Sequence, residues 1–247
     1  MSVIYEPSGK AREYSELACN IYTGCSHKCR YCYCPAILRK SLDEWSAVPG
    51  PRKDIVRQFE REARKMVGDK REILFSFMCD PFQNEEAAAM MGEIMDIAEE
   101  CRLKIKILTK NPKLTESRWE QMRRNKWWLG STICFLSEKM REEWEPGAPT
   151  IRSRVGAIKR AHDFGIKTWL SIEPVIDPVQ ALCVMEALKG HVDKWKVGKL
   201  NHDKPTEERV DWSEFLDRAR VALKGEDVYW KKDLLSAAAK GRVLQHT

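Results

Sequence analysis

Short apolar runs alternate with amphipathic segments along most of the chain. The apolar runs have the length of strands, and they cover residues 17–22, 72–78, 104–109, 128–135, 166–172, 192–197 and 228–230. The segments between them repeat apolar residues every three to four positions, as the buried stripe of a helix does. These segments cover residues 54–66, 85–101, 115–125, 152–164, 178–188, 213–223 and 232–239. Local signals support two boundaries, because Gly165 follows one predicted helix and Pro174 follows one predicted strand.

Strict alternation of strands and helices favours parallel strands joined by right-handed crossovers. Six such units occur between residues 17 and 200, and none carries the glycine fingerprint of a dinucleotide-binding fold. We therefore expect an α/β fold built as a partial (β/α)6 barrel similar to a TIM barrel, with its chemistry at the carboxyl ends of the strands. We expect one domain over residues 1–247, with a core at 17–200 and extensions at 1–16 and 201–247.

The composition is that of an ordinary globular protein. The 247 residues, 43% of them hydrophobic and 32% charged, are enough for one sizeable core. Residues 1–14 contain no apolar run of a secretory signal, and the longest apolar stretch, 127–136, is too short to cross a bilayer. We therefore expect a cytoplasmic protein with no membrane partner. The cysteines number nine and include a tight group between residues 25 and 34, which argues against a disulfide framework.

The charge is unevenly distributed, although the net charge of +6 is mild. Residues 102–126 contain nine lysines and arginines and two glutamates, whereas residues 83–100 contain six acidic residues and no basic one. The basic segment is compatible with a polyanionic partner such as DNA or RNA. A solvated helix face with charged strand ends is the structural alternative, and the sequence leaves both open.

Three cysteines stand directly after the first predicted strand, at Cys25, Cys29 and Cys32, with the spacing C-x3-C-x2-C. Cysteine thiolates hold iron–sulfur clusters, with one iron per ligand. Three thiolates on a four-iron cluster leave one iron open to an outside ligand. The alternatives are a cluster used only for electron transfer and a structural zinc site, which needs a fourth ligand such as Cys34 or His27.

This cysteine spacing, with Tyr31 directly before the third cysteine, resembles the radical S-adenosylmethionine (SAM) superfamily. The stretches that follow resemble its spore-photoproduct-lyase-like branch, often labelled DNA repair photolyases. They are Asn20-Ile21-Tyr22-Thr23-Gly24-Cys25, Cys79-Asp80-Pro81-Phe82-Gln83, Leu108-Thr109-Lys110-Asn111, Glu145-Pro146-Gly147-Ala148-Pro149 with Arg152 and Arg154, and Ser171-Ile172-Glu173-Pro174-Val175-Ile176. The resemblance implies a radical SAM barrel in which Cys25, Cys29 and Cys32 bind a [4Fe-4S] cluster and the open iron chelates the amino and carboxylate groups of SAM.

The resemblance also implies which side chains hold SAM, because the superfamily binds it at the strand ends. Tyr31 is expected near the adenine, Asp80 and Gln83 near the amino group, and Ser131 near the ribose. Lys110 and Arg154 are candidates for the SAM carboxylate. Packing in the core or on the surface is the structural alternative for each of these residues.

Two residues are candidates for catalysis and two for substrate binding. Cys79 ends a predicted strand, where a thiol could return a hydrogen atom to a substrate radical. Glu173 ends another, where a carboxylate could take the SAM ribose hydroxyls or a substrate amine. Lys199 and Asn201 follow the sixth predicted strand and are candidates for a substrate phosphate.

The implied reaction is reductive cleavage of SAM to methionine and a 5′-deoxyadenosyl radical, which then abstracts a hydrogen atom from a substrate. We expect the substrate to be a nucleobase or a DNA lesion, as in a lyase of DNA repair, and the reductant to be a one-electron donor such as flavodoxin or ferredoxin. A peptide or small metabolite is the alternative substrate. A non-catalytic iron–sulfur or zinc protein that binds nucleic acid is the alternative function.

Overall fold

The computed structural model describes residues 2–201 and 203–244, and a single sheet organises this part of the chain. Its strands lie in the order β1-β2-β5-β6-β7-β8-β9-β10. All neighbours pair in parallel except β1, which runs antiparallel to β2. The strand bounds are β1 Ile4–Tyr5, β2 Leu17–Cys19, β5 Glu72–Phe75, β6 Lys104–Thr109, β7 Trp128–Thr132, β8 Lys167–Val175, β9 Lys194–Lys199 and β10 Val228–Trp230.

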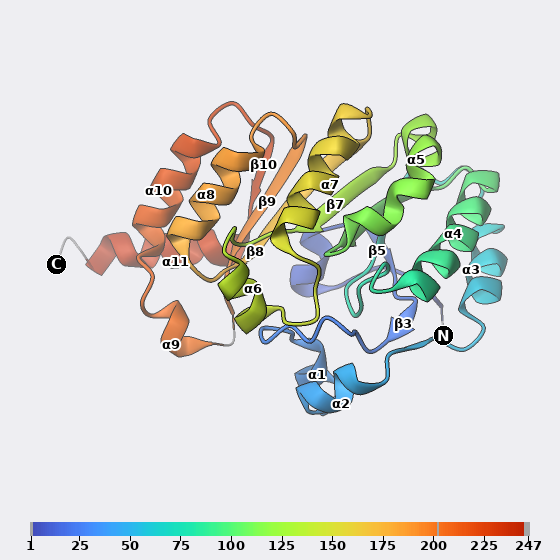
Figure 1. Cartoon of the computed structure of the whole chain (residues 1–247), viewed down its shortest axis with the longest axis horizontal. Helices are drawn as coiled ribbons and strands as arrows, with labels where there is room; N and C mark the ends of the chain where they lie inside the picture. The colour runs from blue at the N-terminus through green and yellow to red at the C-terminus, as the bar shows by residue number, and fades with distance from the viewer. Residues whose placement is uncertain (1, 202, 245–247) are drawn as a thin grey trace.

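Helices connect successive parallel strands and cover one face of the sheet (Figure 1). These helices are α3 Ile55–Ala63, α4 Glu85–Glu100, α5 Trp119–Asn125, α7 Ile151–Asp163, α8 Pro178–Leu188 and α10 Trp212–Ala222, and α11 Lys232–Leu244 follows β10. The predicted alternation is therefore confirmed, and so is the α/β class. Among the described residues, no ladder joins β10 to β1 or β2, as expected for a partial barrel.

Several boundaries differ from those predicted, each for a local reason. The predicted strand 17–22 ends at Cys19, and Tyr22–Thr23 forms a separate strand, β3, that pairs with β4 (Gly50–Pro51). The predicted helix 115–125 begins at Trp119, because Pro112–Arg118 forms a 3-10 helix. Strand β8 continues through Pro174 to Val175, since its pairing with β9 skips that proline and needs no N–H there.

Short helices that the apolar pattern did not predict occur in segments outside the predicted elements. They are α1 Cys34–Ile37, α2 Leu42–Ala47, α6 Glu138–Trp144, α9 Lys204–Glu207 and the 3-10 helix Gly9–Glu13. These helices are too short to show a helical repeat of apolar positions. Capping can still mark them, as at Ser41, which forms a capping box with Glu44 at the start of α2. No helix in residues 2–201 and 203–244 has the length and apolar character needed to cross a membrane.

The N-terminal extension lies against the sheet face opposite the helices. Three buried lysines bind its carbonyl groups. Lys106 on β6 donates to Tyr14 O (3.4 Å), Lys196 on β9 donates to Glu13 O, and Lys231 after β10 donates to Lys10 O (3.2 Å). The residues at 10–14 are thus fixed across three strands, and they fill the concave side of the partial barrel.

The buried Lys196 should give the protein a distinctive pH dependence. Burial, followed by the neighbouring charges of Lys106, Lys231 and Lys194, lowers the pKa of Lys196 to about 7, whereas an unfolded lysine titrates near about 10.4. Between these values the unfolded chain binds one more proton than the folded chain. The free energy of unfolding should therefore rise with pH, by up to about 1.4 kcal/mol per pH unit.

Replacing Lys196 by methionine should remove this contribution, so the stability advantage of the wild type over the variant should grow from neutral to alkaline pH. Urea unfolding at several pH values measures the difference. Lys167→Met is the matched control, because Lys167 is exposed at the start of the neighbouring strand β8 and is not among the charges that shift the pKa of Lys196. Parallel pH profiles for the wild type and Lys196→Met would contradict the expectation.

Candidate functional site

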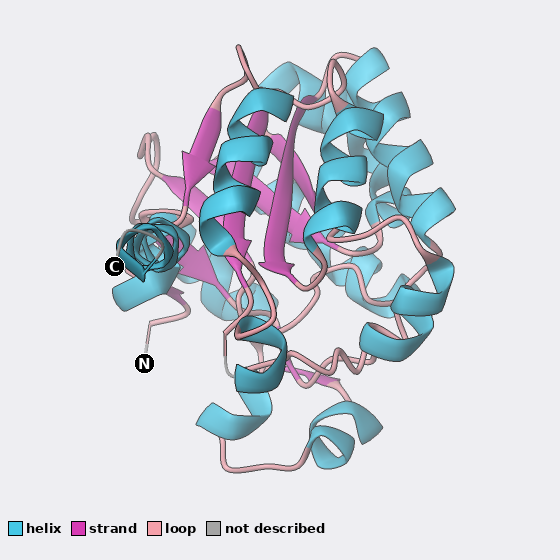
Figure 2. Ribbon diagram, turned by 90° about the vertical axis from the view of Figure 1, so that its left-hand side faces the viewer, coloured by secondary structure: helices cyan, strands magenta, loops and turns pink. Residues whose placement is uncertain are grey.

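The carboxyl ends of the parallel strands face the loop that contains the three clustered cysteines. In Figure 1 the segment formed by β3, α1 and α2 lies below the sheet. In Figure 2, seen from the side, the strand arrows point towards the same lower end. The fold therefore brings residues from the strand ends next to residues 25–34, as the barrel prediction required.

Cys25, Cys29 and Cys32 have free thiols, and Cys32 N donates to Cys29 O at 3.0 Å. Among the described residues, only one group of three or more metal-ligating side chains has its ligand atoms within 4.8 Å of one another, and it lies elsewhere. A structural zinc ion needs four ligands, so Cys34 or His27 would have to join these three thiols. This donor set fits a cubane cluster, whose thiolates bind different irons, better than it fits zinc.

The electrostatics differ among the three cysteines, since a hydrogen bond with Cys34 lowers the pKa of Cys32 to about 7 while the pKa values of Cys25 and Cys29 shift the other way. Burial raises the pKa of the Cys25 thiol well above its usual value, and burial raises that of Cys29 to about 12. Lys110 opposes the shift at Cys29 without cancelling it. Without iron, the thiols of Cys25 and Cys29 therefore hold their protons, and the binding of a metal must displace them.

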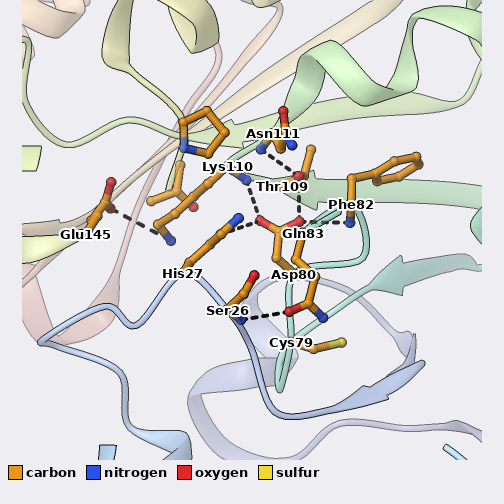
Figure 3. Close-up of polar contacts among 12 residues, drawn as sticks. Ser26, His27, Cys79, Asp80, Phe82, Gln83, Thr109, Lys110, Asn111 and Glu145 are labelled. Carbon is orange, nitrogen blue, oxygen red and sulfur yellow. Dashed lines mark hydrogen bonds and ion pairs between the residues drawn. The ribbon is translucent and has the colours of Figure 1, made fainter. Parts of the chain in front are cut away.

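Asp80 ties the cysteine loop to the strand ends (Figure 3). Its Oδ1 accepts from Thr109 Oγ1 (2.6 Å) and Phe82 N (2.9 Å), and its Oδ2 accepts from Lys110 N (2.6 Å) and lies 3.3 Å from His27 Nδ1. Burial alone would raise the pKa of Asp80, but the interaction with His27 and these hydrogen bonds lower it to about 2. Both carboxylate oxygens therefore have internal partners, and a SAM contact by Asp80 stays a prediction.

Gln83 binds the same loop from the other side. Its Oε1 accepts from Ser26 N at 2.8 Å, and its Nε2 is buried without a hydrogen-bond partner. Cys79, between these residues and β5, is buried, and its Sγ lies 3.0 Å from Ser76 Oγ. Burial raises the pKa of Cys79. The structure thus leaves Gln83 with a free donor and gives the Cys79 thiol a partner outside the cysteine loop.

A buried carboxylate that the sequence analysis did not single out, Glu145, joins three of the predicted SAM residues. It is fully buried, it accepts short hydrogen bonds from Tyr31 Oη and Arg154 Nη1, and it lies 3.8 Å from Lys110 Nζ. The Lys110 ammonium also lies 5.4 Å from the centre of the Tyr31 ring. Burial would lower the pKa of Lys110, but Cys29 and Glu145 outweigh it and raise the pKa. Glu145, a residue from outside the predicted set, therefore brings Tyr31, Lys110 and Arg154 together, and their contacts with SAM stay predictions.

The residues around Glu145 also hold the backbone of the cysteine loop. Arg30 N donates to Trp144 O at 2.8 Å, and Gly147 N donates to His27 O at 3.0 Å. A Cβ at position 147 would lie 2.1 Å from Ser26 O, so only glycine allows this approach. The run Glu145-Pro146-Gly147 was the only sequence signal for this contact.

Glu173 lies at the end of β8 but not within the Glu145 network. Its Oε2 accepts a short hydrogen bond from Tyr14 Oη and lies 3.5 Å from Lys231 Nζ, while Tyr14 Oη is 3.0 Å from Ser171 Oγ. Burial raises the pKa of Glu173, and the Lys231 charge opposes this shift. Tyr14, in the extension that was expected to lie outside the core, is therefore the nearest polar contact of this candidate catalytic residue.

The remaining candidates have internal partners. Ser131 on β7 is fully buried and donates to Thr109 O at 2.7 Å. Lys199 forms a short ion pair with Glu207, and Asn201 donates to Asp233 at 2.8 Å. Their predicted roles with SAM ribose or substrate phosphate stay predictions, and the structure does not bring Lys199 and Asn201 into the network around the cysteine loop.

The basic segment 102–126 is largely neutralised in the fold. Two of its nine basic residues, Lys106 and Lys110, are in the interior contacts described above. Three others are paired with carboxylates: Arg118 with Asp96 (2.6 Å), Arg124 with Glu99 (2.6 Å) and Arg123 with Glu120 (2.9 Å). Asp96 and Glu99 belong to the acidic segment 83–100. Its negative charges therefore offset part of the positive charge of the basic segment 102–126. These ion pairs agree with the structural alternative, and binding of a polyanion by this segment stays a prediction.

Comparison with known proteins finds solved structures with a similar fold. Among solved structures, a variant of spore photoproduct lyase with bound SAM and dinucleoside spore photoproduct has a TM-score of 0.67 at 14% identity, covering 92% of this chain and 78% of that chain. A second variant of this lyase has a TM-score of 0.68 at 15% identity, covering 92% and 79%. Streptococcus suis SuiB bound to precursor peptide SuiA has a TM-score of 0.62 at 15% identity, covering 90% of this chain and 50% of SuiB.

At these identities the likeness concerns the fold alone, and this chain spans about half the length of SuiB. A search of curated proteins found no match. A family model described as the radical SAM superfamily matches residues 19–185, which is more than half of the chain and includes the cysteine loop, the Asp80 contacts and the Glu145 network. The chain therefore belongs to the radical SAM superfamily and is an enzyme of that type.

Proposed function

We propose that Cys25, Cys29 and Cys32 bind a [4Fe-4S] cluster and that SAM binds beside it, at the carboxyl ends of the strands. The observation that carries this proposal is three free thiols in one short loop beside the largely buried ammonium of Lys110. When bound, the reduced cluster supplies the electron that cleaves SAM to methionine and a 5′-deoxyadenosyl radical, which abstracts a hydrogen atom from the substrate.

Two buried donors without partners are suited to SAM. Arg154 Nη2 and Gln83 Nε2 are both buried, and neither has a hydrogen-bond partner in the described part of the chain. Both groups donate, so each suits an oxygen of the SAM carboxylate better than the SAM ammonium. Leaving such atoms unpaired costs about 1–3 kcal/mol each, which supports a role for them in ligand binding.

For the substrate, a nucleobase or DNA lesion remains our proposal, by analogy with the substrate in the structure of spore photoproduct lyase. That lyase matches this chain over 78% of its length, against about half for SuiB. A peptide is the second candidate, because ion pairs with carboxylates engage three of the nine basic residues of 102–126 and reduce the positive charge there for a polyanion. Strong dependence of binding on salt would favour the nucleic acid.

The cleavage of SAM is the direct test. The protein is reconstituted anaerobically with iron and sulfide, given SAM and dithionite, and assayed for 5′-deoxyadenosine by chromatography. We expect the product from the wild type and none from Cys29→Ala. Cys34→Ala is the matched control, because Cys34 begins α1 two residues after Cys32 and its thiol donates to Phe77 O (3.7 Å); it should retain activity. A verified four-iron cluster that yields no 5′-deoxyadenosine would refute the proposal.

The two substrate classes are separated in the same assay. A UV-irradiated oligothymidylate and an unstructured peptide library are added in turn, and the rate of 5′-deoxyadenosine formation is compared with that of SAM alone. Stimulation by the irradiated but not by the intact oligonucleotide supports the nucleobase proposal. Stimulation by peptides alone would overturn it and leave the SAM chemistry in place.

A further inference from the structure

A second cluster of metal-ligating side chains lies at the opposite end of the sheet from the cysteines. His162 and Asp163 end α7, and His191 lies in the loop between α8 and β9. Figure 1 shows the upper end of α7 far from α1 and α2, and the strands in Figure 2 begin at this upper end. The cluster therefore belongs neither to the cysteine loop nor to the Glu145 network.

The ligand atoms of these residues are close enough to share one ion. One nitrogen or oxygen from each of His162, Asp163 and His191 lies within 4.8 Å of the others. Asp163 Oδ1 is 3.5 Å from His191 Nδ1 and 3.8 Å from His162 Nδ1. Ligand atoms on a tetrahedral zinc ion with bonds of about 2.0–2.1 Å lie about 3.4 Å apart, so small side-chain rotations complete the geometry.

One of these atoms is otherwise unpartnered. His191 Nδ1 is buried and makes no hydrogen bond in the described structure, although it faces the Asp163 carboxylate. The two imidazole rings stand almost perpendicular, at 83°, with their centres 5.7 Å apart. Nitrogen atoms of both rings therefore face the Asp163 carboxylate. A metal ion between them could bind His162, His191 and Asp163 at once.

A further carboxylate is positioned to orient His162. Asp193 Oδ1 lies 4.0 Å from His162 Nε2, on the other side of the ring from Nδ1. The Asp193 side chain is itself held, because its Oδ2 accepts from Thr168 N (2.7 Å) and Thr168 Oγ1 (3.2 Å). Thr168 Oγ1 also donates to His191 O at 2.9 Å. A carboxylate behind a ligating histidine is the usual device for fixing the ring and its tautomer.

We propose that His162, His191 and Asp163 bind a divalent transition-metal ion of the zinc class, with Asp193 orienting His162. Two imidazoles and one carboxylate suit zinc and its neighbours, and they suit calcium and magnesium poorly because those ions prefer oxygen ligands alone. The ion would link the end of α7 to the loop before β9. Its role is separate from SAM chemistry, and it does not depend on the proposed function.

The test measures metal in the full chain with the cluster in place, so that the cysteine loop is occupied. The reconstituted protein is dialysed anaerobically against Zn²⁺, and zinc and iron per chain are determined by mass spectrometry. We expect one zinc ion per chain beyond the iron. The double variant His162→Asn/His191→Asn should lose it, and Asp193→Asn should weaken its affinity by about 10–100-fold.

Asp227→Asn is the matched control, since Asp227 is an exposed carboxylate directly before β10 at the same end of the sheet. It should bind zinc as the wild type does. Cobalt provides a second measurement that does not depend on the variants folding. Co²⁺ bound to the wild type should show visible bands of nitrogen and oxygen ligation without thiolate charge transfer. Zinc binding that survives in the double variant, or a thiolate spectrum with cobalt, would overturn the proposal.

Discussion

Glu145→Gln should lower the free energy of unfolding by about 3–5 kcal/mol. Glutamine has nearly the same shape, so the substitution removes the charge without opening a cavity. It leaves the Arg154 guanidinium, which is fully buried, and the Lys110 ammonium, which is largely buried, without their shared carboxylate. A buried charge that has lost its partner keeps the cost of its desolvation. Urea unfolding with linear extrapolation measures the difference.

Glu143→Gln is the matched control for this experiment. Glu143 lies two residues earlier on α6 and pairs with Arg30 at 3.1 Å, but both side chains are more than half exposed. An exposed pair of this kind contributes little to stability, so the control should unfold close to the wild type. Equal losses in the two variants would show that the Glu145 network does not hold the site together.

The same network shows why part of the site could be predicted from sequence and part could not. The three cysteines and Tyr31 lie within eight positions, so a local pattern was enough to predict a metal-binding loop there. Glu145 reaches Tyr31 across 114 positions, and no local pattern reports a contact over that distance. A glutamate next to a proline and a glycine looks like an ordinary turn until the fold places it beside the loop.

Among the strands and helices too, features that depend on nearby residues were predicted and features that depend on distant residues were not. The predicted bounds of β6, α8 and β10 agree with the structure, because apolar periodicity and local signals such as the Asp177 cap of α8 act within a few residues. The position of residues 10–14 depends instead on three lysines that are far away in the sequence, Lys106 on β6, Lys196 on β9 and Lys231 after β10. A sequence gives no sign that a lysine is buried, and lysines are usually on the surface. The sequence therefore did not predict that these lysines hold residues 10–14 against the sheet, with Tyr14 next to Glu173.

The charge pattern illustrates the limit of composition. The acidic stretch at 83–100 and the basic stretch at 102–126 were considered separately, and the basic one was compatible with nucleic acid. In the fold, Asp96 pairs with Arg118 and Glu99 with Arg124. Neighbouring segments of opposite charge on adjacent helices neutralise each other, and only the three-dimensional arrangement shows how much charge is left for a partner.

Gly147→Ala should prevent stable loading of the proposed iron–sulfur cluster. The new Cβ would lie 2.1 Å from Ser26 O and 3.0 Å from His27 Cα, both in the backbone of the cysteine loop. A backbone carbonyl cannot rotate away as a side chain can, so the loop must move and lose the hydrogen bond from Gly147 N to His27 O. Because Cys25 directly precedes Ser26 and Cys29 follows two residues after His27, this movement displaces two of the three ligands.

Iron and sulfide per chain after anaerobic reconstitution measure the effect, and circular dichroism checks that the variant is folded. Gly156→Ala is the matched control, because its Cβ would meet only the end of the flexible Arg160 side chain at 3.2 Å within α7. Alanine is also the better helix former there, so this variant should load its cluster normally. A folded Gly147→Ala protein that binds as much iron as the control would contradict this expectation. The contact of residue 147 with the loop would then not determine the positions of Cys25 and Cys29, and the contacts of Asp80 and Gln83 would have to do so.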